Sequence, residues 1–222
     1  NTHEVVIKKV REWQPDLHFD DITEDWLHRY HIYLKKTCGN NDNTAAKNIT
    51  IFKKYILAAW KMGYMDENPF TNFKIKRGTP SYIYLREDEL KILMDAYKGG
   101  VFESKYHRTL EFFLFMCFAS LHVTDARNLF LEQFTEDSFV YYRVKNRNSK
   151  PEPILVPLSE PLKMILRNVV GTRKKGKIFQ DLPADQTMNR YLKDIAAELE
   201  IKKDITHKAG RHTFATYFLA KT

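Results

Sequence analysis

A short segment near the end of the chain carries three side chains that could bind a phosphate group. The segment is THKAGRHTFAT, residues 206–216, and its central cation is Arg211. A guanidinium binds two oxygens of one phosphate at once, which a lysine ammonium cannot do. His207 and Lys208 precede Arg211 by four and three residues, the spacings of neighbours on a helix surface. We therefore predict a helix with a phosphate site near its start, where free N–H groups add positive potential. The alternative is an ordinary amphipathic helix with a solvated cationic end.

A second group of cations lies on a predicted β-hairpin. Residues 138–145 and 153–158 have the composition of strands, and the polar residues 146–152 between them form the turn. The cations on or beside this turn are Arg143, Lys145, Arg147 and Lys150. Each one set against a DNA phosphate would add affinity that falls as the salt concentration rises.

The remaining elements that must position these groups are helices, and they divide the chain into two domains. Residues 1–73 are predicted to be all-helical, residues 74–84 form a basic linker, and residues 85–222 mix helices with the hairpin. In the first domain, Thr23 should cap one helix, and Asn43 or Thr44 should cap the longest one, which Gly63 should end.

Further cations lie in the first domain and the linker. We expect Lys47 and Lys54, off the apolar face of the longest helix, and Lys74, Lys76 and Arg77, in the linker, to contact DNA. A basic linker can lie along a phosphate backbone, although a plain solvated tether is an equally good interpretation.

Composition indicates a folded protein with an anionic partner. The chain has 222 residues, a net charge of +8 and 43% hydrophobic residues. A basic protein suits nucleic acid or an anionic membrane. The longest apolar stretch, residues 112–121, is far shorter than the ~20 residues that cross a bilayer.

Cys38 and Cys117 provide neither a disulfide framework nor metal-ligand spacing, and Cys117 lies in the apolar stretch and should be buried. We therefore expect a cytoplasmic, nucleoid-associated protein with no membrane contact, no metal and no cofactor.

The order of these motifs resembles that of the tyrosine recombinases, the phage integrase family. RHTFAT, residues 211–216, is similar to the second signature box of the family, and MCFASLHVTDARNL, residues 116–129, is similar to the first. NPF at residues 68–70 and YLREDELKIL at residues 84–93 resemble the end of the family's core-binding domain and the start of its catalytic domain. The resemblance covers nearly the whole chain, and its style is that of integrases of Bacteroidetes mobile elements. It implies a mainly α fold with a small β-hairpin: a helical, SAM-like core-binding domain and an α+β catalytic domain.

The resemblance also implies a reaction. In the family, a tyrosine attacks a DNA phosphate and forms a covalent phosphotyrosine link, while two arginines hold the nonbridging oxygens. A hairpin lysine protonates the leaving 5′-hydroxyl, and a second-box histidine assists proton transfer. Neither ATP nor metal is needed, the partner is double-stranded DNA, and family members act as tetramers on paired DNA sites.

The chain departs from the family pattern in its first box. The first arginine is replaced by His122, and Arg127, five residues later, is a candidate substitute. A functional His122 and a merely tolerated one are both open. Asp125 matches an acidic position of the family, and we expect it to orient the arginine site.

Two further departures concern the proton-transfer residues. Lys208 occupies the position of the second-box histidine, and His207 is displaced from it by one residue. The slot of the hairpin lysine falls at Ser149, so Lys150 is the first candidate and Lys145 the second. Either lysine could instead contact the phosphate backbone without taking part in catalysis.

The nucleophile is the largest gap in the pattern. Tyr217 follows Arg211 by only six residues, which places the two on different helix faces, so we expect Tyr217 in the core. We expect a fragment that stops before the nucleophilic tyrosine, inactive as given, monomeric alone, and a tetramer on DNA when complete. A DNA-binding protein derived from such an enzyme, without catalysis, is the second hypothesis. An unrelated helical scaffold that is basic by accident is the third.

Overall fold

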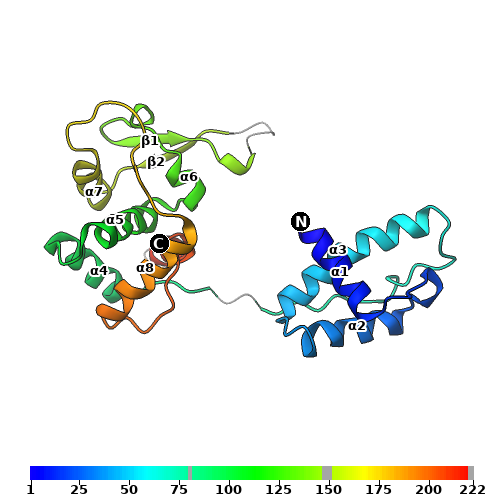
Figure 1. The fold of residues 1–222 in the computed structure, drawn as a ribbon. Coiled ribbons are helices and arrows are strands. Elements are labelled where there is room, and N and C mark those ends of the chain that lie inside the picture. The colour runs from blue at the N-terminus through cyan, green and yellow to red at the C-terminus, as the bar shows by residue number, and fades with distance from the viewer. Residues whose placement is uncertain (80–81, 147–151, 220–222) are drawn as a thin grey trace. The chain divides into compact units, whose positions relative to one another are not determined.

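The chain forms two compact units. The computed structural model describes residues 1–79, 82–146 and 152–219, and the units comprise residues 1–80 and 81–222 (Figure 1). Each unit has its own hydrophobic core. The narrower boundaries inferred from composition, with a linker over residues 74–84, stay a prediction.

The first unit is a helical domain packed around aromatic side chains. Its elements are α1 (Thr2–Trp13), a 3-10 turn (Phe19–Asp21), α2 (Glu24–Lys36) and α3 (Asp42–Lys61). Trp26 and Tyr30 of α2 are fully buried, and Trp26 stacks on Phe52 of α3 at 5.4 Å between ring centroids. These aromatic contacts join α2 to α3.

The ends of the helices in this unit follow local capping chemistry. Thr23 Oγ1 accepts a hydrogen bond from Trp26 N at 3.2 Å, which confirms the predicted cap of α2. The predicted cap of α3 is wrong. Asn41 performs this role, because its side-chain oxygen accepts from Thr44 N at 2.8 Å and the helix begins at Asp42. Gly63, with φ +79°, follows the end of α3 as predicted.

The second unit is built around one buried helix. Its elements are α4 (Glu87–Gly99), α5 (Ser104–Ala119), α6 (Val123–Arg127), a 3-10 turn (Leu131–Gln133), β1 (Ser138–Tyr141), a 3-10 turn (Val144–Asn146), β2 (Ile154–Pro157), α7 (Glu160–Val170), α8 (Asp185–Glu198) and α9 (His207–Leu219). The central helix is α5, which contacts α4, α7, α8 and α9. Its continuous apolar run from Phe112 to Cys117 is buried on every side, which explains why its sequence shows almost no polar face.

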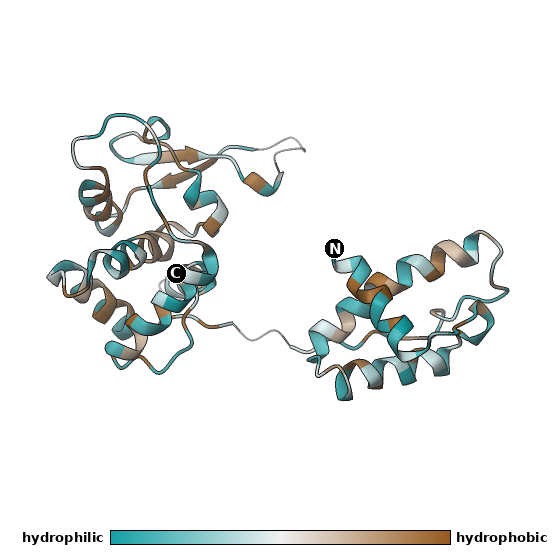
Figure 2. Ribbon diagram, viewed as in Figure 1, coloured by the Kyte–Doolittle hydropathy of each residue, from teal (hydrophilic) through white to brown (hydrophobic). Residues whose placement is uncertain are grey.

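The predicted hairpin is present, although its first strand is shorter than expected. β1 and β2 pair antiparallel, with Ser138 opposite Pro157 and Tyr141 opposite Ile154. Figure 2 colours both strands as apolar. The chain leaves the ladder after Tyr141 rather than at residue 145, because Val144 N donates to Asp125 Oδ1 at 2.9 Å and the backbone turns there. The mainly α fold with a small hairpin agrees with the prediction from sequence.

Candidate functional site

Arg211 is held in place by a close contact between α9 and α5. A Cβ atom added at Gly210 would lie 3.1 Å from Met116 Cβ and 3.5 Å from the backbone N of Cys117. Only a residue without a side chain allows the two helices to approach this closely. Arg211 follows directly, so its Cα is fixed against the buried α5.

The start of α9 differs from the expectation. The helix begins at His207, which places Arg211 in its second turn rather than at its free N–H groups. Two of these groups are already bonded, because His207 N donates to Asn189 Oδ1 at 2.9 Å and Ala209 N donates to Thr206 O at 2.9 Å. The predicted contribution of free N–H groups at the helix start is therefore reduced, and the guanidinium of Arg211 remains the candidate phosphate-binding group of this segment.

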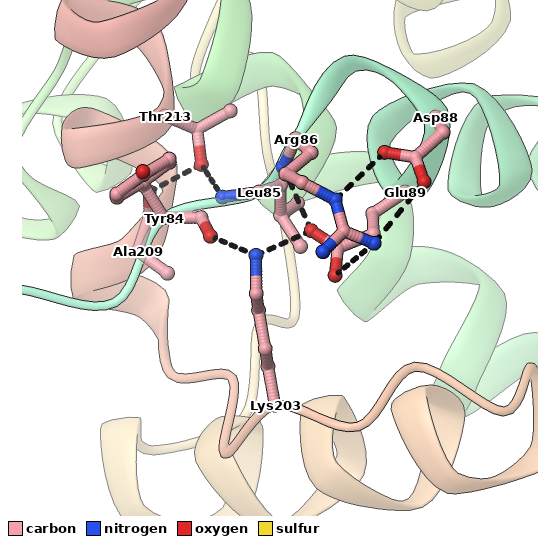
Figure 3. A network of polar contacts seen from close by, with 8 residues as sticks. All are labelled: Tyr84, Leu85, Arg86, Asp88, Glu89, Lys203, Ala209 and Thr213. Carbon is pink, nitrogen blue, oxygen red and sulfur yellow. Dashed lines mark hydrogen bonds and ion pairs between the residues drawn. The ribbon is translucent and has the colours of Figure 1, made fainter.

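A buried hydroxyl joins α9 to the segment that leads into α4 (Figure 3). Thr213 Oγ1 accepts from Leu85 N at 2.9 Å and donates to Ala209 O at 2.8 Å. Tyr82 adds a ring contact with His212, with 4.6 Å between centroids. The residues just before α4 thus pack on the helix turn that carries Arg211.

An ion pair in the same network fixes the loop before α9 (Figure 3). Lys203 Nζ lies 2.5 Å from Glu89 Oε2 and donates to Tyr84 O at 2.8 Å. Glu89 also accepts from Arg86 N at 2.7 Å, so its buried carboxylate is satisfied from two sides. The sequence offers no sign of this pair, because its members are 114 residues apart.

The first box directs His122 outward. Ser120 ends α5 in the left-handed conformation, with φ 57°, and this turn buries Leu121 while it exposes His122. The pKa of His122 is nevertheless lowered, first because the side of the ring that faces the protein is desolvated and then because the positive charges of Arg211 and Arg143 lie nearby. His122 therefore lies within electrostatic reach of these two arginines, and its imidazole is mainly neutral at pH 7.

Arg143 and Arg211 line one cavity. It has a volume of about 280 Å³ and lies between α9, the end of α5 and the hairpin, with Phe214 and Tyr141 among its walls. Burial raises the pKa of Tyr141, so its phenol stays protonated. Two guanidinium groups around a cavity of this kind suit an anion with several oxygens. We call Arg143, Arg211 and His122 the cationic cluster.

Asp125 positions the hairpin rather than a guanidinium. Its side chain is 5% exposed, and it accepts from Val144 N directly after Arg143. This bond ties the exit of β1 to α6 and so brings Arg143 to the cluster. That Asp125 orients the arginine site stays a prediction, and the contact that its side chain makes is with the backbone of Val144.

The side chain of Arg127 binds other parts of the second unit. Its guanidinium donates to Pro183 O, pairs with Asp185 at 3.1 Å between Nη2 and Oδ1, and stacks over Phe112. These contacts link α6 to the start of α8. The structure therefore does not support Arg127 as a substitute for the first arginine, and Arg143 is the residue that shares the cavity with Arg211.

His207 has a defined proton position. Its Nδ1 lies 2.8 Å from Asn189 Oδ1, and because an amide oxygen only accepts, Nδ1 must carry the proton. Burial lowers the pKa of His207, and the nearby Lys208 and Arg127 lower it as well, against Asp185, which raises it. With a lowered pKa and its proton on Nδ1, the ring is neutral and its Nε2 carries no proton. Sequence reasoning missed Asn189, which a single sequence does not single out.

The other predicted site residues fall into three groups. Lys208 and Lys145 are exposed on the second unit. In the first unit the exposed ones are Lys47, Lys54, Lys74, Lys76 and Arg77. Lys150 and Arg147 lie outside the described residues. Tyr217, expected in the core, is half-buried.

The described residues give no indication of a metal site or of a membrane span. Among them, no three His, Cys, Asp or Glu side chains are grouped so that they could hold a metal ion. Within the same ranges, no helix has the length and apolarity to cross a bilayer.

The first unit matches a protein-family model over most of its length. Residues 1–75 match the family model described as "Phage integrase SAM-like domain". A tyrosine recombinase of Thermosipho africanus (strain TCF52B) is 26% identical over 190 residues, which are 81% of this chain and 63% of that protein. The chain thus spans less than two thirds of the length of that relative.

Solved structures share the fold of the whole chain. A lambda integrase dimer bound to a COC′ core site superposes with a TM-score of 0.76 at 14% identity, over 99% of this chain and 82% of that one. The Tn1549 transposon integrase in complex with circular intermediate DNA gives 0.71 at 16% identity, over 92% and 75%. The predicted fold class, a SAM-like domain followed by an integrase catalytic fold, is confirmed.

Proposed function

We propose that the chain belongs to the tyrosine recombinase, or phage integrase, family and acts in site-specific DNA recombination, as the integrase of a mobile element. The observation that carries the proposal is the cavity shared by Arg143 and Arg211. Double-stranded DNA is the partner, and one backbone phosphate occupies this cavity.

The cationic cluster acts on the nonbridging oxygens of the phosphate. Arg211 and Arg143 donate to them, and these contacts gain strength as negative charge grows in the transition state. His122, whose pKa responds to both arginines, is a third candidate donor. Arg143 in this role compensates for the loss of the first-box arginine.

Proton transfer is assigned to residues beside the cluster. His207, neutral with its proton on Nδ1, presents Nε2 as a proton acceptor, and Lys208 is a positive donor on the same helix turn. Lys150, or Lys145 as second choice, protonates the leaving 5′-hydroxyl. Tyr217 is not proposed as the nucleophile, because six residues of α9 place it on a different face from Arg211.

The second candidate function is DNA binding without strand cleavage, by a protein derived from a recombinase. The replacement of the first arginine by His122 favours it, because a mainly neutral imidazole stabilises a transition-state charge less well than a guanidinium. In both functions the chain is expected to be a monomer in the absence of DNA, and a recombinase that contains it is expected to act as a tetramer on DNA.

DNA binding is tested with a fluorescein-labelled duplex and anisotropy at several salt concentrations. The Kd should rise with salt, and Arg211→Ala and Arg143→Ala should each weaken binding modestly and reduce the salt slope by about one. Lys98→Ala, which removes the same charge from the last turn of α4, is the control. Weak, salt-insensitive binding would contradict the proposal.

Cleavage is tested separately with a suicide duplex and detection of a covalent protein–DNA adduct. A complete recombinase should form the adduct, and Arg211→Ala should abolish it. Unchanged cleavage in that variant would remove Arg211 from the site. If no adduct forms while DNA binding persists, the second candidate function is the correct one.

A further inference from the structure

A second and larger groove adjoins the cationic cluster. Its volume is about 680 Å³, and its walls include Tyr142, Phe130 and Lys177. Tyr141 and Arg143 line both this groove and the smaller cavity that contains Arg211. A DNA strand whose phosphate lies between the two arginines would therefore have its neighbouring nucleotide at the groove.

Two aromatic rings are exposed in this groove. Tyr142 is 54% exposed and Phe130 is 42% exposed, whereas the adjacent Tyr141 is buried in the core. Large apolar surfaces of this kind are costly to leave in water, and two of them in one groove indicate a ligand with a flat apolar face.

The backbone presents Phe130 rigidly. Leu129 O accepts from Ile178 N at 3.0 Å and Leu131 N donates to Gly176 O at 2.9 Å, so Phe130 lies between two hydrogen bonds to the loop after α7. It also forms an isolated β-bridge with Lys177. The backbone that carries the ring is therefore already fixed before a ligand binds.

The groove also carries positive charge. Arg143 and the exposed Lys177 lie on its walls, and the one carboxylate there, Asp125, is buried and bonded to Val144 N. Aromatic faces interleaved with cations are the general means of binding an unpaired nucleotide, because the rings stack on its base and the cations bind its phosphate.

We propose that this groove binds an unpaired nucleotide of the DNA strand next to the phosphate held by Arg143 and Arg211. Its base stacks on Tyr142 or Phe130, and Lys177 binds its backbone. The proposal rests on the proposed function, because a strand that leaves one duplex to join another must first unpair near the exchange point. In an intact duplex the base faces are covered by their neighbours, so the groove distinguishes opened from paired DNA.

The test compares two labelled DNA molecules, a matched duplex and the same duplex with a short central bubble of mismatched bases. Anisotropy at fixed salt should show that the chain binds the bubble about fivefold more tightly or better, the lower end of the effect of stacking one base. A 2-aminopurine placed in the bubble should be quenched on binding.

Substitutions assign the preference to the groove. Tyr142→Ser and Phe130→Ser should bring the ratio of the Kd for the matched duplex to the Kd for the bubble close to one. The Kd for the matched duplex itself should stay the same. Tyr64→Ser, which removes a ring that is 63% exposed in the first unit, is the control and should keep the full preference. Thermal melting of each variant checks that the second unit is folded.

The possible outcomes are distinct. Salt-dependent binding of both DNA molecules with equal affinity overturns the groove proposal and leaves the proposed function intact. A preference for the bubble that survives both groove substitutions also overturns it. If neither DNA molecule binds in a salt-dependent way, the proposed function itself fails.

Discussion

The hydroxyl of Thr213 accepts a 2.9 Å hydrogen bond from the backbone N–H of Leu85, across 128 residues of sequence. Thr213 is two residues after Arg211 on α9, and Leu85 is two residues before α4 begins. The turn of α9 that carries Arg211 and the entrance to the second unit are therefore one structural piece, and the stability of the one depends on the other.

Thr213→Val keeps the shape of the side chain and removes the hydroxyl. Leu85 N then loses its partner in a buried position, so the free energy of unfolding should fall by about 1–3 kcal/mol. Urea denaturation of the two proteins measures this. Thr213→Ser keeps the oxygen, so its free energy of unfolding should fall by less. If Thr213→Val were as stable as the unsubstituted protein, this hydrogen bond would not contribute to stability.

Gly210→Ala tests the contact between α9 and α5. The added methyl group meets Met116 and the backbone of Cys117, so overpacking should lower the free energy of unfolding by about 1–3 kcal/mol. Gly99→Ala is the matched control: it lies in α4, its Cβ would meet Val101 at an ordinary 3.5 Å, and the change should be neutral or stabilising. A stable Gly210→Ala variant would mean that α5 moves easily.

Stability should depend on the protonation of His207. Burial lowers its pKa in the folded state below the unfolded value of about 6.5, so the unfolded state binds more protons. The corresponding stability is present above the unfolded pKa and is lost as the pH falls through the folded pKa. Urea denaturation should show that the free energy of unfolding decreases as the pH falls below about 6.5.

His207→Gln is the companion to this measurement. Glutamine has no ionisable group, so the decrease over the same pH range should become smaller. The lowered pKa of His122 contributes in the same direction, and some decrease should therefore remain. A parent and a variant with parallel pH profiles would contradict the assignment to His207.

His122→Arg should restore the guanidinium that the first box lacks. An arginine beside Arg143 and Arg211 remains charged at neutral pH and forms charge-assisted bonds to a phosphate, so duplex binding should tighten by roughly tenfold. Gln180→Arg, which adds the same charge at an exposed position, is the control and should have a smaller effect. Anisotropy in one buffer measures both.

Proton uptake provides a second readout for His122. A phosphate placed in the cluster offsets the positive charges that lower the pKa of His122, so DNA binding should raise this pKa and take up protons. The affinity of the parent should therefore increase as the pH falls from about 7.5 to about 6, and this increase should shrink in His122→Arg. An equal increase in both proteins would exclude His122 as its source.

The elements that a single sequence predicts well are those with a strong local signal. The apolar run of α5, the hairpin and the helix around Arg211 are of this kind, since their type depends on residues close in the chain. The cap of α3 was misplaced because Asn41, Asn43 and Thr44 are all good capping residues, and only the backbone decides among them.

The site contacts that could not be predicted join residues far apart in sequence. Arg127 lies inside the first box and seemed suitable for phosphate binding, yet its partner Pro183 is 56 residues away. Arg143 reaches the cavity of Arg211 through the turn that Asp125 imposes on the backbone of Val144. Neither arrangement leaves a periodic or compositional trace.

The close packing at Gly210 also means that the alkylation rate of Cys117 can report local opening between α9 and α5. Cys117 Sγ lies 3.6 Å from the position that a Cβ of Gly210 would take, and Cys117 is buried. Burial also raises the pKa of its thiol, so thiol reagents cannot attack it while α9 is packed on α5. In a Cys38→Ser background, the alkylation rate of Cys117 then reports how often the helix that carries Arg211 lifts from α5. If DNA binds Arg211 as proposed, it should slow this labelling, and the reactivity of Cys117 would then report whether the proposed phosphate site is occupied.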